Sequence, residues 1–344
     1  MSSFDPNNIS VPNGNYFALP YTPEESRLVL LSVPWDVTTS YRPGTSLGPD
    51  AIIAASAQVD LYDHHCGNSY EKGIGTLPIE ENILEGSNLL RRDAEKIIHH
   101  LEEGGSLDHE TVQKRLARIN KASVKVNEYV YRTAKEWIEK GKTVGLVGGD
   151  HSTPLGLMKV IAEKYPGTGI LHIDAHADLR EAYEGFTYSH ASIMYNMLNE
   201  APGIGKLVQV GIRDLCDDEI NRIRTHPKIK TFFDYDLQER KFRGESWEQV
   251  CREILSELPE QVYLSFDIDG LSPELCPSTG TPVPGGLSFH EAIYLIRSII
   301  ESGRTLVGFD LTEVAPSKNE EDEWDANVGA RVLYKLCNFI LKQE

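Results

Sequence analysis

Residues 171–178 constrain the fold of this chain more than any other stretch. The apolar run 169–173 leads directly into Asp174, His176 and Asp178, which follow one another at intervals of two residues. A continuous apolar run of this length is typical of a strand that is buried on both faces of a parallel sheet. Side chains two residues apart point to the same side of an extended backbone, so these three can converge if the backbone stays extended. The stretch therefore predicts a buried strand that ends in a polar site.

The three polar residues of this stretch are of types that bind metal ions. Imidazole and carboxylate together suit divalent ions such as manganese, nickel, iron or zinc. No cysteine lies nearby, which argues against a structural zinc site. An alternative interpretation is a solvated turn or a hydrogen-bonded cluster, and the rest of the chain has to decide between these.

Three further stretches show the same pattern of an apolar run that leads into polar residues. Each is an apolar run that ends in potential metal ligands or in an acidic residue. They are residues 142–148 followed by His151, residues 261–266 followed by Asp267 and Asp269, and residues 305–312 followed by Glu313. Helical patterns lie between the strands, so the sequence predicts an α/β fold with a parallel sheet, in which all four strand ends lie along one edge.

Six potential ligands at one edge of a sheet are too many for one catalytic ion. They suit two ions about 3.5 Å apart that are bridged by carboxylates and hold a water molecule. The alternative is that some of the acids only cap or pair, but this many carboxylates do not share a crevice without cations. The sequence therefore predicts a dinuclear metal site.

Charge and composition exclude several classes of function. The formal net charge is -18, and no basic run is present that could follow a phosphate backbone. Nucleic acid and membranes are therefore not expected as partners, whereas cationic substrates suit the charge. The five cysteines form no C-x-x-C pair, and the N-terminus lacks a signal pattern, so we expect a cytoplasmic protein.

The chain shows no linker and no repeat that would divide it. We expect a single domain over residues 1–344, with an irregular arm over about residues 1–25 that lies on the surface or across a neighbouring subunit. Residues of about 80–140 are predicted to form two helices, separated by a break at Gly104 and Gly105. No chemistry is assigned to these helices, which have the apolar spacing of packing elements.

Five motifs, taken together and in this order, resemble those of the ureohydrolase family of arginases and agmatinases. The resemblance extends from about residue 29 to the C-terminus. The motifs are Gly-Gly-Asp-His-Ser at 148–152, Asp-Ala-His-Ala-Asp at 174–178, Ser-Phe-Asp-Ile-Asp at 265–269, Thr-Gly-Thr-Pro at 279–282, and the strand that ends at Glu313.

This resemblance implies a three-layer α/β/α sandwich around a mainly parallel sheet, assembled as a homotrimer or homohexamer. It also implies two Mn²⁺ ions per chain, with Ni²⁺ as an alternative. By position, the ligands of one ion would be His151, Asp174, Asp178 and Asp267. Those of the other would be Asp174, His176, Asp267 and Asp269, so that Asp174 and Asp267 bridge.

The resemblance further implies hydrolysis of a guanidinium group to urea and an amine. His190 matches the family's loop histidine, which passes a proton to the leaving amine, and Glu313 matches the acid that binds the guanidinium. Asp178 counts with them as a catalytic residue. Cys216 stands where arginases carry an aspartate for the α-amino group, and the loop before His190 is closer to agmatinases, although residues 281–288 are closer to arginases.

We therefore expect agmatine, cleaved to putrescine, as the substrate. Arginine, guanidinobutyrate, guanidine and a formiminoglutamase-like activity are alternatives in the same reaction class. Two further hypotheses are a catalytically silent subunit, which typically loses ligands, and a metal-dependent deacylase, which needs only one ion. The retention of all six ligands together with His190 and Glu313 argues against both.

Overall fold

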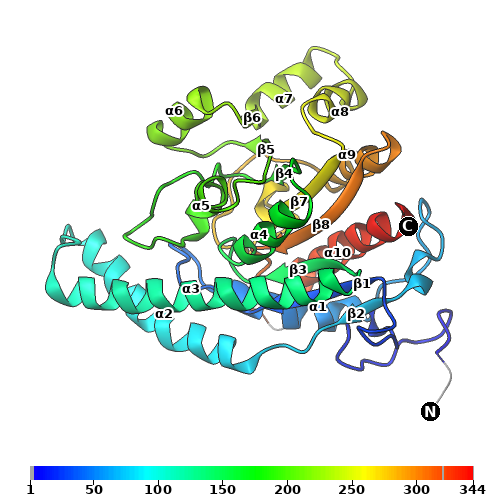
Figure 1. Ribbon diagram of the computed structural model, residues 1–344, viewed down its shortest axis with the longest axis horizontal. Coiled ribbons are helices and arrows are strands. Elements are labelled where there is room, and N and C mark those ends of the chain that lie inside the picture. Colours follow the sequence, from blue (N-terminus) through cyan, green and yellow to red (C-terminus); the bar gives the residue numbers. More distant parts are fainter. Residues whose placement is uncertain (1–3, 320, 344) are drawn as a thin grey trace.

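A parallel sheet of eight strands forms the centre of the protein (Figure 1). The computed structural model describes residues 4–319 and 321–343. The strands follow the spatial order β2-β1-β3-β8-β7-β4-β5-β6, and every neighbouring pair is parallel. Their bounds are β1 Leu28–Val33, β2 Ile74–Thr76, β3 Thr143–Gly148, β4 Gly169–Ile173, β5 Lys206–Ile212, β6 Ile229–Phe233, β7 Gln261–Asp267 and β8 Thr305–Thr312.

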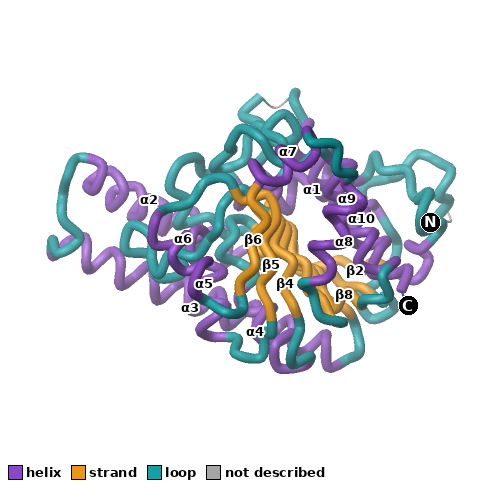
Figure 2. Tube along the Cα trace, turned by 90° about the horizontal axis from the view of Figure 1, so that it is seen from above, coloured by secondary structure: helices purple, strands orange, loops and turns teal. Residues whose placement is uncertain are grey.

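Helices cover both faces of the sheet, which makes a three-layer α/β/α sandwich (Figure 2). One face is packed by α1 Gly48–Ser56, α7 Asp234–Phe242, α8 Trp247–Ser256, α9 Phe289–Glu301 and α10 Trp324–Gln343. The other face is packed by α2 Glu81–Glu102, α3 Glu110–Glu139, α4 Leu155–Lys164, α5 Ile193–Glu200 and α6 Asp217–Thr225. The predicted fold class is confirmed.

The strands supply both helical layers with apolar side chains by alternation. In β7, Val262, Leu264 and Phe266 join the core beneath α8, α9 and α10, whereas Tyr263 joins the core on the opposite face. All four are fully buried, because a central parallel strand is covered on both sides. Ser265 belongs to the same face as Tyr263, so the strand also carries a polar group into the interior.

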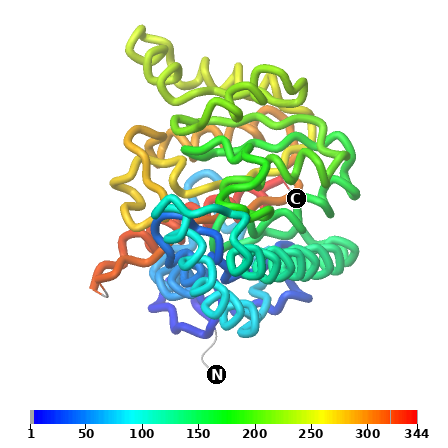
Figure 3. Tube along the Cα trace, turned by 90° about the vertical axis from the view of Figure 1, so that its left-hand side faces the viewer, coloured from blue at the N-terminus to red at the C-terminus, as the bar shows by residue number. Residues whose placement is uncertain are grey.

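The predicted helical stretch forms two long helices, α2 and α3, with the break where the two glycines lie. Each helix has one apolar face: Ala94 and Ile97 of α2 and Ile119 of α3 are fully buried, while charged residues cover the outer side. Figure 1 shows the two helices, in cyan and teal, running side by side along the molecule, and in Figure 3 they are viewed from the end at which the chain turns from α2 to α3.

The N-terminal arm differs from its prediction. Residues 16–19 are buried and join the core near α1 and α10, so a surface arm is wrong for this part of the chain. The Tyr16 hydroxyl bonds Ser32 at 2.8 Å, and the ring of Phe17 lies 4.8 Å from that of Tyr334. Four consecutive nonpolar side chains, Tyr-Phe-Ala-Leu, are the physical reason, because leaving them in water is unfavourable.

At the edge of the sheet lies β2, a strand of three residues that pairs with the outer side of β1. No sequence pattern indicated this strand. Within residues 4–319 and 321–343, no helix combines the length and apolar character that a membrane crossing requires.

Candidate metal centre

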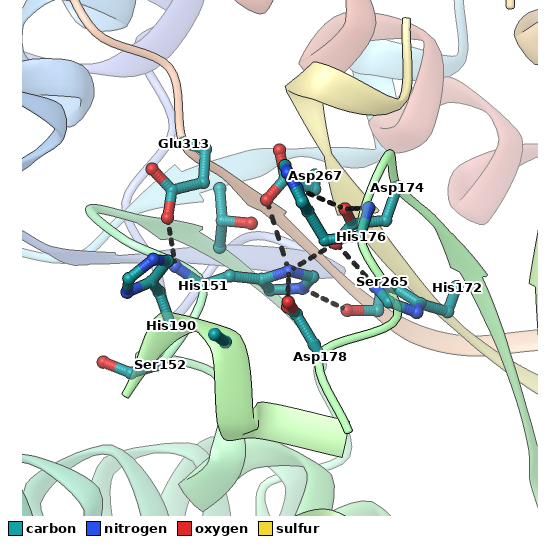
Figure 4. Close-up of polar contacts among 12 residues, drawn as sticks. His151, Ser152, His172, Asp174, His176, Asp178, His190, Ser265, Asp267 and Glu313 are labelled. Atoms are coloured by element: carbon teal, nitrogen blue, oxygen red, sulfur yellow. Dashed lines mark hydrogen bonds and ion pairs between the residues drawn. The ribbon is translucent and has the colours of Figure 1, made fainter. Parts of the chain in front are cut away.

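The predicted ligands come from strands that are neighbours in the middle of the sheet. β3, β8, β7 and β4 lie side by side, and the residues after their carboxyl ends converge (Figure 4). Parallel strands place these ends at one edge, which is the usual position of a binding site in an open α/β sheet. The sequence prediction that these four strand ends lie along one edge of a parallel sheet is confirmed.

Four residues form what we call the deep ligand group: His151, Asp174, Asp178 and Asp267. The Nδ1 atom of His151 lies 3.0 Å from Asp174, 3.1 Å from Asp178 and 3.3 Å from Asp267, in each case from Oδ2. All four side chains are almost fully buried. Three carboxylate oxygens and one imidazole nitrogen that lie this close together form a donor set for a divalent cation.

Three residues form the outer ligand group: Asp174, His176 and Asp269. The Nδ1 atom of His176 lies 3.1 Å from Oδ2 of Asp269 and 3.5 Å from Oδ1 of Asp174. Asp174 thus offers Oδ2 to the deep group and Oδ1 to the outer group. His176 is 23% exposed, so the outer group reaches solvent while the deep group does not.

The backbone of residues 174–178 does not stay extended, which corrects the sequence prediction. β4 ends at Ile173, and Asp178 adopts a left-handed conformation with φ of 54°. That conformation is rare for residues other than glycine, asparagine and aspartate. The ligands converge because the chain turns sharply at Asp178, which brings its carboxylate back towards His151. Strain at such a position is typical of functional sites.

The electrostatics of both groups favour a cation. Burial raises the pKa of Asp178 to about 7, with Asp174 adding to the shift, and burial together with Asp269 and Asp174 raises that of Asp267 well above its usual range. Burial lowers the pKa of His151, but the three neighbouring carboxylates outweigh it and raise the pKa well above its usual value. Among the described residues, the ion-pair partners of the four aspartates are histidines rather than lysine or arginine. The residues therefore fit divalent ions.

The sequence prediction missed His172, which lies in β4 and also contacts Asp174. Its Nε2 atom is 2.8 Å from Oδ2 of Asp174, so the donor set around the deep group contains a second buried histidine. Burial lowers the pKa of His172, so the ring is neutral at neutral pH. The signal was a histidine inside an otherwise apolar run, two residues before Asp174.

Glu313 lies next to the deep group. Its Oε1 accepts the backbone N–H of His151 at 2.9 Å, whereas Oε2 is buried and has no hydrogen-bond partner among the described residues. Burial raises the pKa of Glu313 well above its usual range, with Asp150 adding to the shift. The residue has φ of 62°, and hydrogen bonds from its own N–H to Gly149 and from Thr279 to its carbonyl hold it in place.

A cavity of about 150 Å³ opens beside the outer group. His176, Asp178 and His190 contribute to its walls. His190 is buried, and its ring lies 3.4 Å from the Ser40 hydroxyl and 3.3 Å from that of Ser189. Burial lowers the pKa of His190 to about 3, and the nearby charge of His176 adds to the shift, so the imidazole of His190 is neutral.

Several residues of this cavity were not predicted from the sequence. Cys216, which the resemblance placed at the substrate, instead forms the N-terminus of α6 and lies outside the cavity walls. Asp214 lines the cavity in its place and is exposed. Other unpredicted members of the wall are Ser40, Arg180, Tyr183 and Thr281. They come from loops, whose side-chain positions are not readable from sequence periodicity.

Comparison with known proteins agrees with this geometry. An N(1)-aminopropylagmatine ureohydrolase of Thermus thermophilus is 32% identical over 298 residues, which cover 86% of this chain and 84% of that protein. The agmatinase of Bacillus anthracis is 28% identical and covers 87% of each chain. The crystal structure of a hypothetical agmatinase from Burkholderia thailandensis has the same fold, with a TM-score of 0.72, 24% identity and coverage of 98% of this chain and 92% of that one.

A family-level match covers nearly the whole chain. The sequence model described as "Arginase family" matches residues 26–338, a range that contains all eight strands and both ligand groups. The family match, the Thermus relative and the buried His and Asp cluster point to the same conclusion. The chain belongs to the arginase family of metal-dependent ureohydrolases.

Proposed function

We propose that this protein hydrolyses a guanidino compound to urea and an amine, and that its substrate is agmatine or an agmatine with an N-alkyl substituent. The observation that carries the proposal is the buried Oε2 of Glu313, an acceptor without a partner among the described residues, beside two groups of metal ligands. A guanidinium is planar and cationic and offers parallel N–H donors to a carboxylate. An unpaired buried carboxylate is therefore a binding position for such a group.

Two divalent ions would be held by the two ligand groups, and Asp267 of the deep group would serve both ions. His151, Asp174, Asp178 and Asp267 would hold one, and Asp174, His176, Asp267 and Asp269 the other. We propose manganese, with nickel as the alternative, because both accept mixed oxygen and nitrogen donors. When bound, the ions supply Lewis acidity that lowers the pKa of water at the site.

Glu313 positions the reacting carbon. Its Oε1 is fixed by the N–H of His151, so Oε2 is free to accept an N–H of the guanidinium. The salt bridge neutralises the buried acid and places the guanidinium carbon next to the ligand groups. Orientation of this kind contributes to catalysis because the substrate no longer needs to find the reactive geometry by diffusion.

His190 would serve the leaving amine. Its neutral imidazole can accept the proton that the attacking water loses and pass it to the leaving amine, and the hydroxyl of Ser40, 3.4 Å away, connects it to the cavity. The amine nitrogen must gain a proton as its bond to the guanidinium carbon breaks. A buried histidine that lines the cavity is placed for this transfer.

The tail of the substrate would extend along the cavity. Asp214 lines this cavity, and Arg180, which also lines it, is paired with Glu219 at 3.7 Å. The charge of Asp214 therefore favours a tail that ends in an ammonium group. The names of the compared relatives support this choice, because one acts on N(1)-aminopropylagmatine and another on agmatine. Arginine, guanidinobutyrate and guanidine are the alternatives within the same reaction.

The test is urea release from Mn²⁺-loaded and Ni²⁺-loaded protein. The compounds are agmatine, N(1)-aminopropylagmatine, arginine, guanidinobutyrate and guanidine. We expect the two agmatines to give the highest kcat/KM. The matched variant Asp214→Asn should lower kcat/KM for agmatine about tenfold and leave guanidine, which has no tail, unchanged. Urea from none of the compounds, with two ions bound, would overturn the proposed reaction and favour a formimino substrate.

We propose one ureohydrolase domain over residues 1–344, with α2 and α3 as an elaboration of it. A homotrimer or homohexamer in the cytoplasm is the proposed assembly. Supporting the single domain, strands from both halves of the chain alternate within one sheet.

A further inference from the structure

A row of polar side chains crosses the middle of the sheet, directly beneath the ligand groups. Strand pairing places its members opposite one another on the neighbouring strands β6, β5, β4, β7 and β8. They are Thr231, Gln209, His172, Ser265 and Asp310, and we call them the polar row. All of them except Thr231 are fully buried, and most of the other buried side chains of the sheet are apolar. Burying polar groups is costly, so a row of this kind needs a reason.

On one side of the row, hydrogen-bond roles are fixed by a carbonyl. The Nε2 of Gln209 lies 2.8 Å from the Ala177 carbonyl oxygen, which can only accept, so this atom is the amide nitrogen and it donates. The same nitrogen lies 3.0 Å from Nδ1 of His172, which must therefore accept. Thr231 agrees with this orientation, because its hydroxyl donates to Oε1 of Gln209 at 2.9 Å.

The role of His172 follows from this. With Nδ1 accepting, the proton of the neutral ring is on Nε2, which donates to Oδ2 of Asp174 at 2.8 Å. No lone pair of the ring then faces the deep ligand group. His172 is a hydrogen-bond donor that fixes the shared carboxylate, although it lies near enough to His151, Asp174 and Asp178 to be counted among possible metal ligands.

On the other side of the row, roles are fixed by a carboxylate. Asp310 accepts hydrogen bonds from the Tyr263 hydroxyl at 2.7 Å and from the Ser265 hydroxyl at 3.1 Å. The Ser265 proton is thereby used, so its oxygen accepts from Nε2 of His151 at 2.8 Å. The lone pair of His151 is then on Nδ1, the atom that faces the three aspartates.

We propose that the polar row sets opposite roles for two histidines at the same carboxylate: through Ser265 and Asp310 it makes His151 a metal ligand, and through Gln209 it makes His172 a hydrogen-bond donor to Asp174. Gln209, His172, Ser265 and Asp310 are thus positioning residues. The inference rests on the metal site of the proposed function and not on its substrate.

The direct test is NMR of the wild-type protein, with ¹⁵N-labelled histidine, loaded with ¹¹³Cd²⁺. A nitrogen that binds cadmium shows one-bond coupling to it. We expect coupling at Nδ1 of His151 and of His176 and none at His172, whose Nε2 should carry a proton. Cadmium coupling at His172, or a proton on its Nδ1, would overturn the inference. Because no substrate is involved, failure of the urea assay would not affect this result.

A pair of variants tests the same point through metal affinity. The apparent Kd should rise about tenfold to a hundredfold in His172→Phe, which has no donor, and only about fivefold or less in His172→Gln, whose amide can donate to Asp174. Gln209→Met should raise the apparent Kd for the metal about as much as His172→Phe does. Equal losses in both His172 variants would contradict a donor role.

The control for these variants is Thr168→Val. Thr168 is buried just before the opposite end of β4, and its hydroxyl bonds the Tyr165 carbonyl at 2.6 Å. This change removes a buried polar group from the same part of the fold, so it should lower thermal stability without changing the metal Kd. A changed Kd in Thr168→Val would show that the affinity responds to any loss of stability.

Discussion

The deep and outer ligand groups share Asp174 but differ in their surroundings. His151 of the deep group is enclosed and is held from behind by Ser265, whereas His176 of the outer group is 23% exposed and lines the cavity. A buried donor set supported by further hydrogen bonds holds an ion in a fixed geometry, whereas a set open to solvent can exchange its ligands. We therefore expect the deep group to retain its ion and the outer group to respond to substrate.

The largest effect is expected where the two groups meet. Asp174→Asn keeps the shape of the side chain but removes the charge that both groups share. Neither group should then bind tightly, and kcat should fall about 10⁴-fold or more. Metal analysis after dialysis should find less than one ion per chain, while circular dichroism should be unchanged. Retention of two ions would show that the groups do not depend on this carboxylate.

The second change separates the two groups. His176→Asn removes an outer ligand and leaves the deep donor set complete, so one ion per chain should survive dialysis while kcat falls about 10³-fold. Asp178→Asn is the matched change in the deep group. It should lose the tightly held ion, and because the outer group alone exchanges its ion, less than one ion per chain should survive dialysis. Equal metal content in the two variants would remove the distinction between deep and outer groups.

The third change leaves both groups intact and removes only the substrate acceptor. Glu313→Gln keeps an oxygen for the N–H of His151 but loses the negative charge of Oε2. Two ions should remain bound, and kcat/KM for agmatine should fall about 10²-fold. If metal content falls together with activity, Glu313 supports the metal site instead of the substrate.

The smallest effect is expected in the loop beside the outer group. Burial raises the pKa of Glu184 to about 7, with Glu102 adding to the shift and Arg91 opposing it. The folded state thus binds this proton more tightly than the unfolded state, and its stability contribution is lost as pH rises from about 4.5 to about 7. Glu184→Gln does not titrate, so its melting temperature should exceed that of the wild type by about 1–2 °C at pH 8.

The comparison at low pH is the control for that prediction. At about pH 4 the glutamate is protonated in both states, so variant and wild type should melt together. A difference that is the same at both pH values would mean that the glutamine acts through packing. The effect concerns stability alone, because Glu184 lies outside both ligand groups.

The fold class and the site were readable from the sequence because they depend on local patterns. Apolar runs predicted the central strands, and the residues that follow or end three of them, β3, β4 and β7, make up both ligand groups. Parallel topology then brings these ends to one edge regardless of loop detail. The helices α2 and α3 were likewise visible from their apolar spacing.

The features that the sequence did not reveal depend on contacts between neighbouring strands of the sheet. The role of His172 is set by Gln209, which lies opposite it in the register of β4 and β5. Register and hydrogen-bond direction are properties of the folded sheet and leave no local pattern. The left-handed turn at Asp178 and the wall of the cavity were missed for a similar reason, since tertiary contacts determine them.

The position of β8 in the sheet has a consequence for the order of assembly. β8 is the last strand of the chain, yet it lies between β3 and β7 and joins the strands that carry His151 and Asp267. Until it is inserted, the two parts of the sheet have no hydrogen-bonded connection. Contacts between residues so far apart in sequence form late, after much chain entropy has been lost. The two parts of the sheet can therefore form before β8 joins them, but the ligand groups, which take His151 from one part and the aspartates from the other, are complete only after β8 is in place.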